Sequence, residues 1–572
     1  VDERVSPRAL RELYLKGFEI AVREGKPWTV MASYNAINGT LAQENHDLLT
    51  DVLRTDWGYD GMVMTDWIGR RNTGAQVHAG NDLMEPGQAQ QSEEIVAKVR
   101  SGELALEDVD TSVRRLLEYI VKTPTFNKYA ATDAPDLKAH ADITRRAANE
   151  GIVLLKNNGV LPLASDIKTV ALYGVSSYEF LSGGVGSGCV HPPYVVDMVA
   201  GLTNAGLQTT PQLTSTYKKY IDFAAEKFEM DRHPTKWFQS PVMGQQKYPE
   251  IGFSQFAISK EAAQADAAII TFGRQAGEGI DREIDGEFNL TPEEMTLLSD
   301  VTSAFHQAGK PVIVILNSGS VMETASWKSF PDAILVAWQP GMEGGNSVAD
   351  ILTGKANPSG KLTMTWPLNV ADHPSTKNFP QPMDLYTYNS VYDWNKAVPG
   401  YHYTNHDEDI YVGYRYFDTF GKPVSYPFGY GLSYTDFAYS KPSVSRKGEE
   451  ITVSVTVKNT GKTAGKEVVQ VYVTAPEGTL EKPEKELKTF GKTRELQPGE
   501  SETLRMTLNR RDLASFDEAQ SAWVVDPGTY SFHIAASAAD VRATVPITID
   551  GMTEKTTDAL RLREPIHRLS HK

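Results

Sequence analysis

Five short, almost entirely apolar runs constrain the middle of this chain more than any other feature. They occupy residues 152–155, 170–173, 268–272, 312–316 and 333–337. Helical patterns such as residues 292–307 separate them. Continuous apolar runs are typical of strands that are buried on both faces of a parallel sheet. We therefore predict an α/β sandwich over residues 142–368.

The first 121 residues alternate helix and strand patterns. Ser6 followed by Pro7 is typical of a helix start, and apolar residues recur at helical spacing to about Glu24. Strand candidates lie at residues 28–34, 61–66 and 81–85, and further helices are expected at about 44–57, 93–100 and 107–121. This βαβ pattern predicts a parallel sheet or barrel over residues 1–121, followed by a linker at 122–141.

The last third of the chain changes character. Residues 369–434 are dense in Tyr, Pro, Asn and Asp with little periodicity, which predicts a long ordered connection. Strict alternation of apolar and polar residues follows, at 451–457, 504–508 and 530–534, with turn signals between. Short alternating strands of this kind predict a β-sandwich of immunoglobulin or fibronectin type III type over residues 435–550, before a tail at 551–572.

Charge and composition exclude several classes of function. The 57 Lys and Arg residues against 73 Asp and Glu give a net charge of −16, so nucleic acid is not an expected partner. No apolar run approaches the roughly 20 residues that span a bilayer, so we expect a soluble chain without a membrane partner. The single cysteine, Cys189, allows no intramolecular disulfide. Cytoplasmic and secreted locations both remain open.

Asp66 ends the strand candidate of residues 61–66, where barrel enzymes hold their catalytic groups. Trp67 beside it offers an aromatic face to a sugar ring, although a single Trp is more often part of a core. An Asp at a strand end equally suits the cap of a following helix. The residue alone leaves both interpretations open.

Glu278 lies in a loop directly after the apolar run of residues 268–272, with a glycine on each side. The glycines leave its carboxyl group little shielded. Asp281 and Arg282 are expected to pair and to shape this loop, although the same charges suit a solvated loop. Glycoside hydrolysis needs two carboxylates, one to attack the anomeric carbon or activate water and one to protonate the leaving oxygen. The chain has 73 acidic residues, so spacing alone does not select the pair.

Motifs of other enzyme classes are not matched, because their residues do not have the required spacing. The glycine-rich run at 182–188 has neither the GxGxxG pattern of a dinucleotide cradle nor a Walker lysine. Val185 stands where a nucleophile elbow at Ser187 needs its first glycine. The histidines show no metal-binding spacing. We therefore expect no α/β-hydrolase, no metal and no cofactor.

Eight short segments follow one another along nearly the whole chain. They are WTVMASYN with NG at 28–39, GMVMTDW at 61–67, AGND at 79–82, EGIVLLKN at 150–157, GEG with DR at 277–282, NPSGKL at 357–362, IYVGYRY at 410–416 and FGYGLSY at 428–434. In this order they resemble glycoside hydrolase family 3, in the three-domain arrangement of bacterial β-glucosidases.

The resemblance implies a retaining exo-β-glycosidase, in the first place a β-glucosidase that removes terminal non-reducing β-D-glucosyl residues. It implies that Asp66 is the nucleophile and Glu278 the acid/base. Tyr34 and Trp67 would line the subsite for the terminal sugar, and Ser187 would also touch it. A β-xylosidase or another β-glycosidase of the family is the alternative.

A complete (β/α)8 barrel takes about 250 residues. Residues 1–121 hold three strand–helix units, so the resemblance implies the C-terminal part of a TIM-type barrel. Three parallel strands leave an open sheet edge. We expect a second chain or another copy of this one to complete the barrel. An inactive remnant is the third possibility for this part. The alternative of another class is a non-catalytic carbohydrate-binding or assembly subunit.

Overall fold

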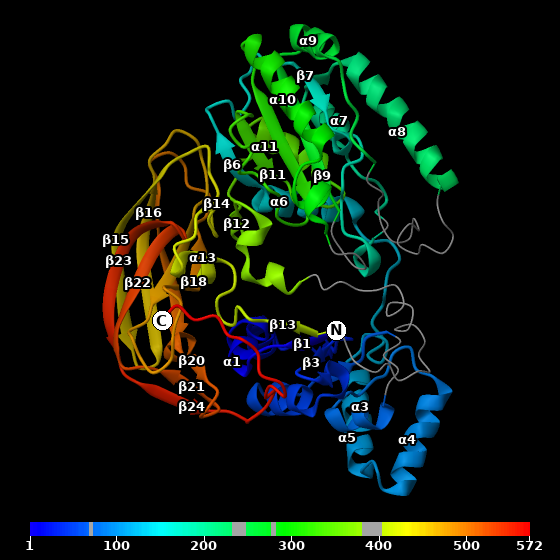
Figure 1. The fold of residues 1–572 in the computed structure, drawn as a ribbon, viewed down its shortest axis with the longest axis vertical. Coiled ribbons are helices and arrows are strands. Elements are labelled where there is room, and N and C mark those ends of the chain that lie inside the picture. The colour runs from blue at the N-terminus through cyan, green and yellow to red at the C-terminus, as the bar shows by residue number, and fades with distance from the viewer. Residues whose placement is uncertain (68–71, 191, 232–247, 276–281, 380–402) are drawn as a thin grey trace.

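A computed structural model describes residues 1–67, 72–190, 192–231, 248–275, 282–379 and 403–572 of the chain. Figure 1 shows an α/β body at the top, a smaller body of helices and short strands at the bottom, and a β-sandwich along the side of both. Among the described residues, none of the helices combines the length and the apolar character needed to span a bilayer.

The N-terminal part opens with a helical stretch that ends at Gly25, close to the predicted end at about Glu24. Its elements are β1 (Asp2–Arg4), α1 (Pro7–Ala9), η1 (Leu10–Tyr14), α2 (Lys16–Ile20), η2 (Ala21–Gly25), β2 (Thr29–Met31), β3 (Ala36–Ile37), β4 (Thr40–Leu41), η3 (Ala42–Glu44), η4 (Asp47–Asp56), β5 (Met62–Met64), α3 (Thr73–Ala79), α4 (Ala89–Ser101) and α5 (Leu106–Ile120). The Ser6 side chain accepts a hydrogen bond from the Ala9 amide, and Pro7 occupies the first turn. Ser6 and Pro7 therefore start this helix as predicted.

The barrel strands are present but short. β2 and β5 pair in parallel, with Thr29 opposite Met62, and the third strand candidate is a single parallel bridge from Met64 to Leu83. The unpredicted strand β1 pairs in parallel with β3 and with β13 (Tyr403–Asn405) from the distant connection. We call the N-terminal part from β1 to α5 the barrel part. One of its strands thus pairs with a strand that lies some 400 residues away in sequence.

The middle of the chain forms the predicted α/β sandwich, although its first helix begins at Leu137, within the predicted linker of residues 122–141. Its elements are α6 (Leu137–Gly151), β6 (Val153–Asn157), β7 (Thr169–Tyr173), η5 (Val175–Ser177), η6 (Gly186–Gly188), α7 (Met198–Asn204), β8 (Gln208–Thr209), α8 (Pro211–Asp231), α9 (Gln255–Gln264), β9 (Ala267–Arg274), η9 (Ile284–Phe288), α10 (Pro292–Gln307), β10 (Val312–Ser318), β11 (Ala333–Val336) and α11 (Gly344–Leu352). The strand order is β6-β11-β10-β9-β7-β8. All five apolar runs are strands of this sheet, and every residue of β9 and β10 is buried.

One strand departs from the expected parallel arrangement. β6 runs antiparallel to its neighbour β11. An antiparallel strand at the edge of an otherwise parallel sheet is common in such folds. Leu154 of β6 also bridges Leu432 from the connection, so this edge is covered and its apolar run resembles that of an inner strand.

The connection and the β-sandwich follow, and residues 380–402 of the predicted connection (residues 369–434) lie outside the described residues. Their elements are β12 (Trp366–Pro367), η10 (Val370–Asp372), η11 (Pro374–Lys377), β13, α13 (Tyr414–Thr419), β14 (Val424–Tyr426), β15 (Phe437–Lys447), β16 (Glu450–Asn459), β17 (Val468–Thr474), β18 (Glu486–Lys492), β19 (Ser501–Asn509), η12 (Arg510–Leu513), β20 (Ser515–Asp517), β21 (Ala522–Val525), β22 (Gly528–Ser537), β23 (Asp540–Ile549) and β24 (Met552–Lys555). Sheets β15-β16-β19 and β18-β17-β22-β23 bury their alternating apolar residues between them. The predicted β-sandwich is confirmed.

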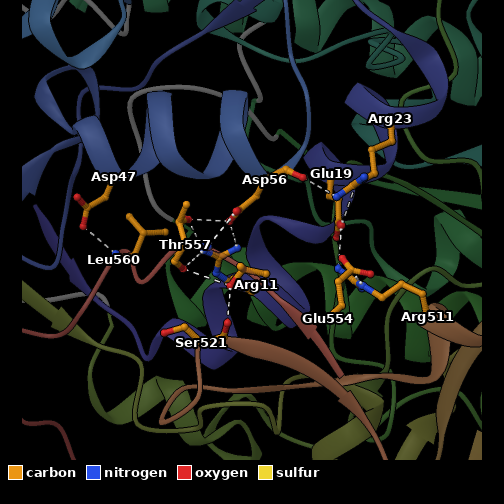
Figure 2. A network of polar contacts seen from close by, with 11 residues as sticks. Arg11, Glu19, Arg23, Asp47, Asp56, Arg511, Ser521, Glu554, Thr557 and Leu560 are labelled. Carbon is orange, nitrogen blue, oxygen red and sulfur yellow. Dashed lines mark hydrogen bonds and ion pairs between the residues drawn. The ribbon is translucent and has the colours of Figure 1, made fainter. Parts of the chain in front are cut away.

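Polar contacts join the C-terminal tail to the barrel part (Figure 2). The Arg11 guanidinium lies 2.8 Å from an Asp56 carboxylate oxygen and donates to the Thr557 carbonyl at 3.1 Å. Arg511 of η12 donates to Glu19 of α2 at 3.1 Å. Leu560, which is only 3% exposed, packs among apolar residues of the first helix and of η4. The tail and the β-sandwich therefore contact the barrel part and stabilise it from outside.

Candidate active site

Asp66 follows β5 in the barrel part and is half-buried. One of its carboxylate oxygens accepts a hydrogen bond from the Trp67 amide at 2.6 Å. This local contact orients the carboxylate at the strand end. The residue therefore occupies the position that the sequence pattern predicts, at the carboxyl end of a parallel strand.

The strand that carries Asp66 is fixed by a buried carboxylate, Asp82. It accepts a hydrogen bond from the Val63 amide at 2.9 Å and pairs with Arg54 at 2.9 Å. Its other oxygen accepts from Ser112 and from Arg115, both at 3.2 Å. Burial and the nearby Arg115 lower the pKa of Arg54, while the charge of Asp82 opposes this shift. These contacts make Asp82 the anchor of β5.

Asp82 was part of a noted motif, but sequence reasoning assigned it no role. Its partners are contributed by η4, β5 and α5, which are separated in sequence. The one local signal is the preceding Gly80, whose backbone φ of 105° ends α3 and turns the chain toward β5.

Tyr34 and Trp67 lie beside Asp66. The Tyr34 hydroxyl donates to the Trp67 carbonyl, which joins the loops after β2 and β5. The two side chains are 46% and 59% exposed, large values for aromatic rings. Exposed rings next to a carboxylate suit a sugar, since its apolar face stacks on an aromatic surface and its hydroxyl groups need polar partners. The structure thus brings together three of the five predicted site residues.

The other two predicted residues belong to the α/β sandwich. Ser187 lies on the exposed turn η6 (Gly186–Gly188). Glu278 lies outside the described residues, between Gln275 and Arg282 in the sequence. Gln275 accepts a hydrogen bond from Gln339 at 2.9 Å, and Arg282 donates to the Val321 carbonyl at 2.7 Å. The described chain on each side of Glu278 is therefore anchored to loops that follow neighbouring strands of the sheet.

Within its described residues, the chain holds no group of three or more His, Cys, Asp or Glu side chains arranged to bind a metal ion. The chemistry that the barrel part offers is that of a carboxylate beside exposed aromatic rings. This site lies in a chain that also holds an α/β sandwich and a β-sandwich.

Family comparisons identify all three parts. Residues 2–119 match the glycosyl hydrolase family 3 N terminal domain, 152–434 match the family 3 C-terminal domain, and 467–538 match a fibronectin type III-like domain. The chain belongs to glycoside hydrolase family 3, and the predicted family and fold class are confirmed.

The relatives and solved structures agree with this assignment. The chain is 42% identical to β-glucosidase 3B from Thermotoga neapolitana, solved with α-D-glucose, with a TM-score of 0.89 over 97% of this chain and 75% of that one. It is 33% identical to an exo-α-(1->6)-L-arabinopyranosidase of Bifidobacterium longum over 96% of this chain and 67% of that protein. A thermostable β-glucosidase B of Acetivibrio thermocellus is 34% identical over 95% of this chain and 66% of that protein. The chain thus spans about two thirds of the length of these two relatives.

Proposed function

We propose that this glycoside hydrolase is a retaining exo-β-glycosidase, in the first place a β-glucosidase, with Asp66 as nucleophile. The observation that carries the proposal is the half-buried Asp66 carboxylate at the end of β5, beside the exposed rings of Tyr34 and Trp67. Support comes from the β-glucosidases among the relatives and from the solved complex of one of them with glucose.

The proposed reaction is a double displacement. The Asp66 carboxylate attacks the anomeric carbon and the bond to the leaving oxygen breaks, while Glu278 gives that oxygen its proton. Glu278 then takes a proton from water, and this water releases the sugar from Asp66 with the original anomeric configuration. Asp66 must begin ionised and Glu278 protonated, so the environments of the two groups must differ.

Tyr34, Trp67 and Ser187 are proposed to hold the terminal sugar. The rings would stack on its apolar face, and Ser187 would bind a hydroxyl group. Another β-glycosidase activity, such as β-xylosidase, is the near alternative, and the arabinopyranosidase among the relatives supports testing several sugars.

Hydrolysis of aryl glycosides tests the proposal. Asp66→Asn should lower kcat by at least about 10³-fold, since one attacking group is lost. Asp60→Asn is the matched control, because Asp60 is an exposed carboxylate just before the same strand. Equal activity in wild type and Asp66→Asn would refute the nucleophile role. In Glu278→Ala, azide should restore part of the slow second step, and its failure to do so with a good leaving group would count against Glu278.

A separate part of the proposal concerns the surface of the barrel part. Apolar side chains of α5 are exposed, among them Leu106 at 59%, Val113 at 48% and Leu117 at 55%. Phe18 at 56% and Trp28 at 53% are exposed as well. Apolar surfaces of this kind mark interfaces. We propose that further strand–helix units cover them, on a second chain or another copy of this one.

Mass measurement in solution tests this part. A complex that contains barrel strands from another polypeptide, together with sugar turnover, is the expected result. A stable monomer without turnover would instead favour the non-catalytic carbohydrate-binding or assembly subunit, for which the same exposed face is the motivating observation.

A further inference from the structure

A cavity of about 380 Å³ lies where the barrel part, the β-sandwich and the C-terminal tail meet, among the polar residues of Figure 2. Arg11 and Arg23 line it from the barrel part, and Arg511 of η12 and Lys555 of β24 line it from the C-terminal side. Of the predicted site residues that the structure describes, none lines this cavity. Cavities of this size hold small molecules. The cavity is therefore a second candidate site, separate from the carboxylate at the end of β5.

The lining of this cavity carries an excess of positive charge. Its four cations are accompanied by three carboxylates, those of Glu19, Asp56 and Glu554. Glu19 and Glu554 both pair with Arg511, at 3.1 and 3.3 Å. Asp56 pairs with Arg11 at 2.8 Å. The carboxylates thus neutralise only part of the lining, although the chain as a whole has a net charge of −16.

Glu19 brings two of the arginines together. Its Oε1 accepts hydrogen bonds from Arg23 at 3.2 Å and from Arg511 at 3.1 Å. Burial alone would raise the pKa of Glu19, but the charges of Lys16, Arg511 and Arg23 outweigh it and lower this pKa. Glu19 therefore stays ionised and holds two guanidinium groups, one from each side of the cavity, on one oxygen.

The arginines have N–H donors that these contacts do not use. A guanidinium has five N–H groups. The Arg11 side chain is buried, and its Nε has no hydrogen-bond partner among the described residues. Arg23 and Arg511 each use Nε and Nη2, and their Nη1 groups make no hydrogen bond within the described parts of the chain. Because a buried donor without a partner is costly, a ligand with acceptor oxygens would be stabilised here.

The chemistry of the lining suits an oxyanion better than a neutral sugar. Trp523 lines the cavity but is only 4% exposed, and the Arg511 guanidinium lies over its ring, 3.8 Å from the centroid. This ring therefore offers a sugar no free face. Guanidinium groups match the geometry of carboxylates and phosphates. A phosphate group has three acceptor oxygens, which suits three arginines better than the two oxygens of a carboxylate.

We propose that this cavity binds a phosphate group, either free phosphate or the phosphate of a small metabolite, through Arg11, Arg23 and Arg511. Lys555 contributes a fourth positive charge. A bound phosphate would contact both the barrel part and the C-terminal side, so its binding would stabilise the contact between them. The proposal requires neither Asp66 nor Glu278 and is therefore independent of the proposed function.

Thermal unfolding and titration calorimetry at neutral pH test the proposal, with inorganic phosphate as the first probe. Potassium phosphate should raise the unfolding temperature at least about 2 °C above that in potassium chloride of equal ionic strength, because a ligand of the folded state stabilises it. Arg23→Gln and Arg511→Gln should each weaken phosphate binding at least about tenfold, since each removes a charged donor.

Arg542→Gln is the matched control. Arg542 forms a bidentate pair with Asp540, at 2.6 Å to each oxygen, on the surface of the same β-sandwich. This variant should bind phosphate as wild type does. The Arg23 side chain is 43% exposed, so Arg23→Gln should fold and supplies the comparison even if Arg511→Gln does not.

Ribose 5-phosphate and ribose identify the source of the phosphate group. Tighter binding of ribose 5-phosphate than of inorganic phosphate would support a phosphorylated metabolite, and equal binding would support free phosphate, provided that both arginine variants weaken it. The proposal is refuted if phosphate causes no more stabilisation than chloride, or if both arginine variants bind phosphate as tightly as wild type. Ribose that binds as tightly as ribose 5-phosphate, and only in the presence of both arginines, would refute the phosphate as the recognised group.

Discussion

The barrel part (β1 to α5) and the α/β sandwich (α6 to α11) differ in how they bury their apolar residues. In the α/β sandwich, one cluster extends over the whole sheet and its helices, and the inner strands β9 and β10 are buried at every residue. In the barrel part, the apolar residues form small clusters, while Phe18, Trp28 and one face of α5 remain exposed.

The difference shows where each part obtains its stability. The α/β sandwich shares one extensive apolar cluster, to which the connection adds Tyr426 and Leu432. The barrel part relies on contacts from elsewhere, namely β13 beside β1, Thr557 on Asp56, and Leu560 within an apolar cluster. Asp66 lies in this second part, after β5.

The largest expected effect tests the extensive apolar cluster. Phe305 on α10 is fully buried and packs edge-on against Tyr173. Phe305→Ala should lower the free energy of unfolding of the α/β sandwich by about 4 kcal/mol, since it removes a large side chain and leaves a cavity. Phe256→Ala is the matched control, because Phe256 is 81% exposed and its loss should cost less than about 0.5 kcal/mol. Chemical denaturation measures both, and equal losses would contradict the role of this cluster.

The next effect tests the stabilisation of the barrel part from outside. Asp56→Ala removes the carboxylate that faces Arg11 and Thr557, and it leaves the Arg11 guanidinium buried without that partner. We expect a loss of about 3 kcal/mol in the unfolding of the barrel part, and faster proteolysis of the tail. Asp51→Ala on the same helix keeps these contacts and serves as control. If both variants behave alike, the tail does not stabilise the barrel part.

The buried sheet was predictable from the sequence because its strands are apolar at nearly every position. The helix start at Ser6 and Pro7 was predictable because capping is a local property. The pairing of β1 with β13 was not predictable, since both strands are three residues long and some 400 residues apart. The antiparallel direction of β6 was not predictable either, because an apolar run does not show in which direction its strand will pair.

The candidate site shows the same division. The position of Asp66 follows from the strand that precedes it, and this strand was visible as an apolar run. The anchoring role of Asp82 depends on Arg54, Ser112 and Arg115, which only the folded chain brings together.

A smaller, pH-dependent effect should arise where β13 meets the barrel part. His406 follows β13 and contacts Glu3 of β1 at 3.0 Å. Burial alone would lower the pKa of His406, but hydrogen bonds to Glu3 and Glu408 outweigh it and raise the pKa to about 9. A raised histidine pKa stabilises the fold fully below about pH 6.5, and this stabilisation is lost as the pH rises through about 9.

The difference in unfolding temperature between wild type and His406→Gln should therefore shrink as the pH rises from 6.5 to 9.5. We expect a change of about 2 °C, measured by thermal unfolding in matched buffers. His533→Gln is the control, because burial lowers the pKa of this histidine of the β-sandwich. A difference that stays constant across this range would refute the charged tie between His406 and Glu3.

The smallest expected effect concerns the exposed face of α5. It tests the contrast between the two parts most directly, because it depends on whether another polypeptide covers this face. Leu117→Gln on the exposed face of α5 should change the free energy of unfolding of this chain alone by less than about 0.5 kcal/mol, since the side chain is already 55% exposed. Leu104→Gln should cost several times more, because Leu104 is only 4% exposed. If further strand–helix units cover this face, Leu117→Gln should instead weaken their association by about tenfold, as measured by titration of the complex. A large loss in a chain shown to be monomeric would mean that the face is buried within the chain itself, and the contrast between the two parts would then disappear.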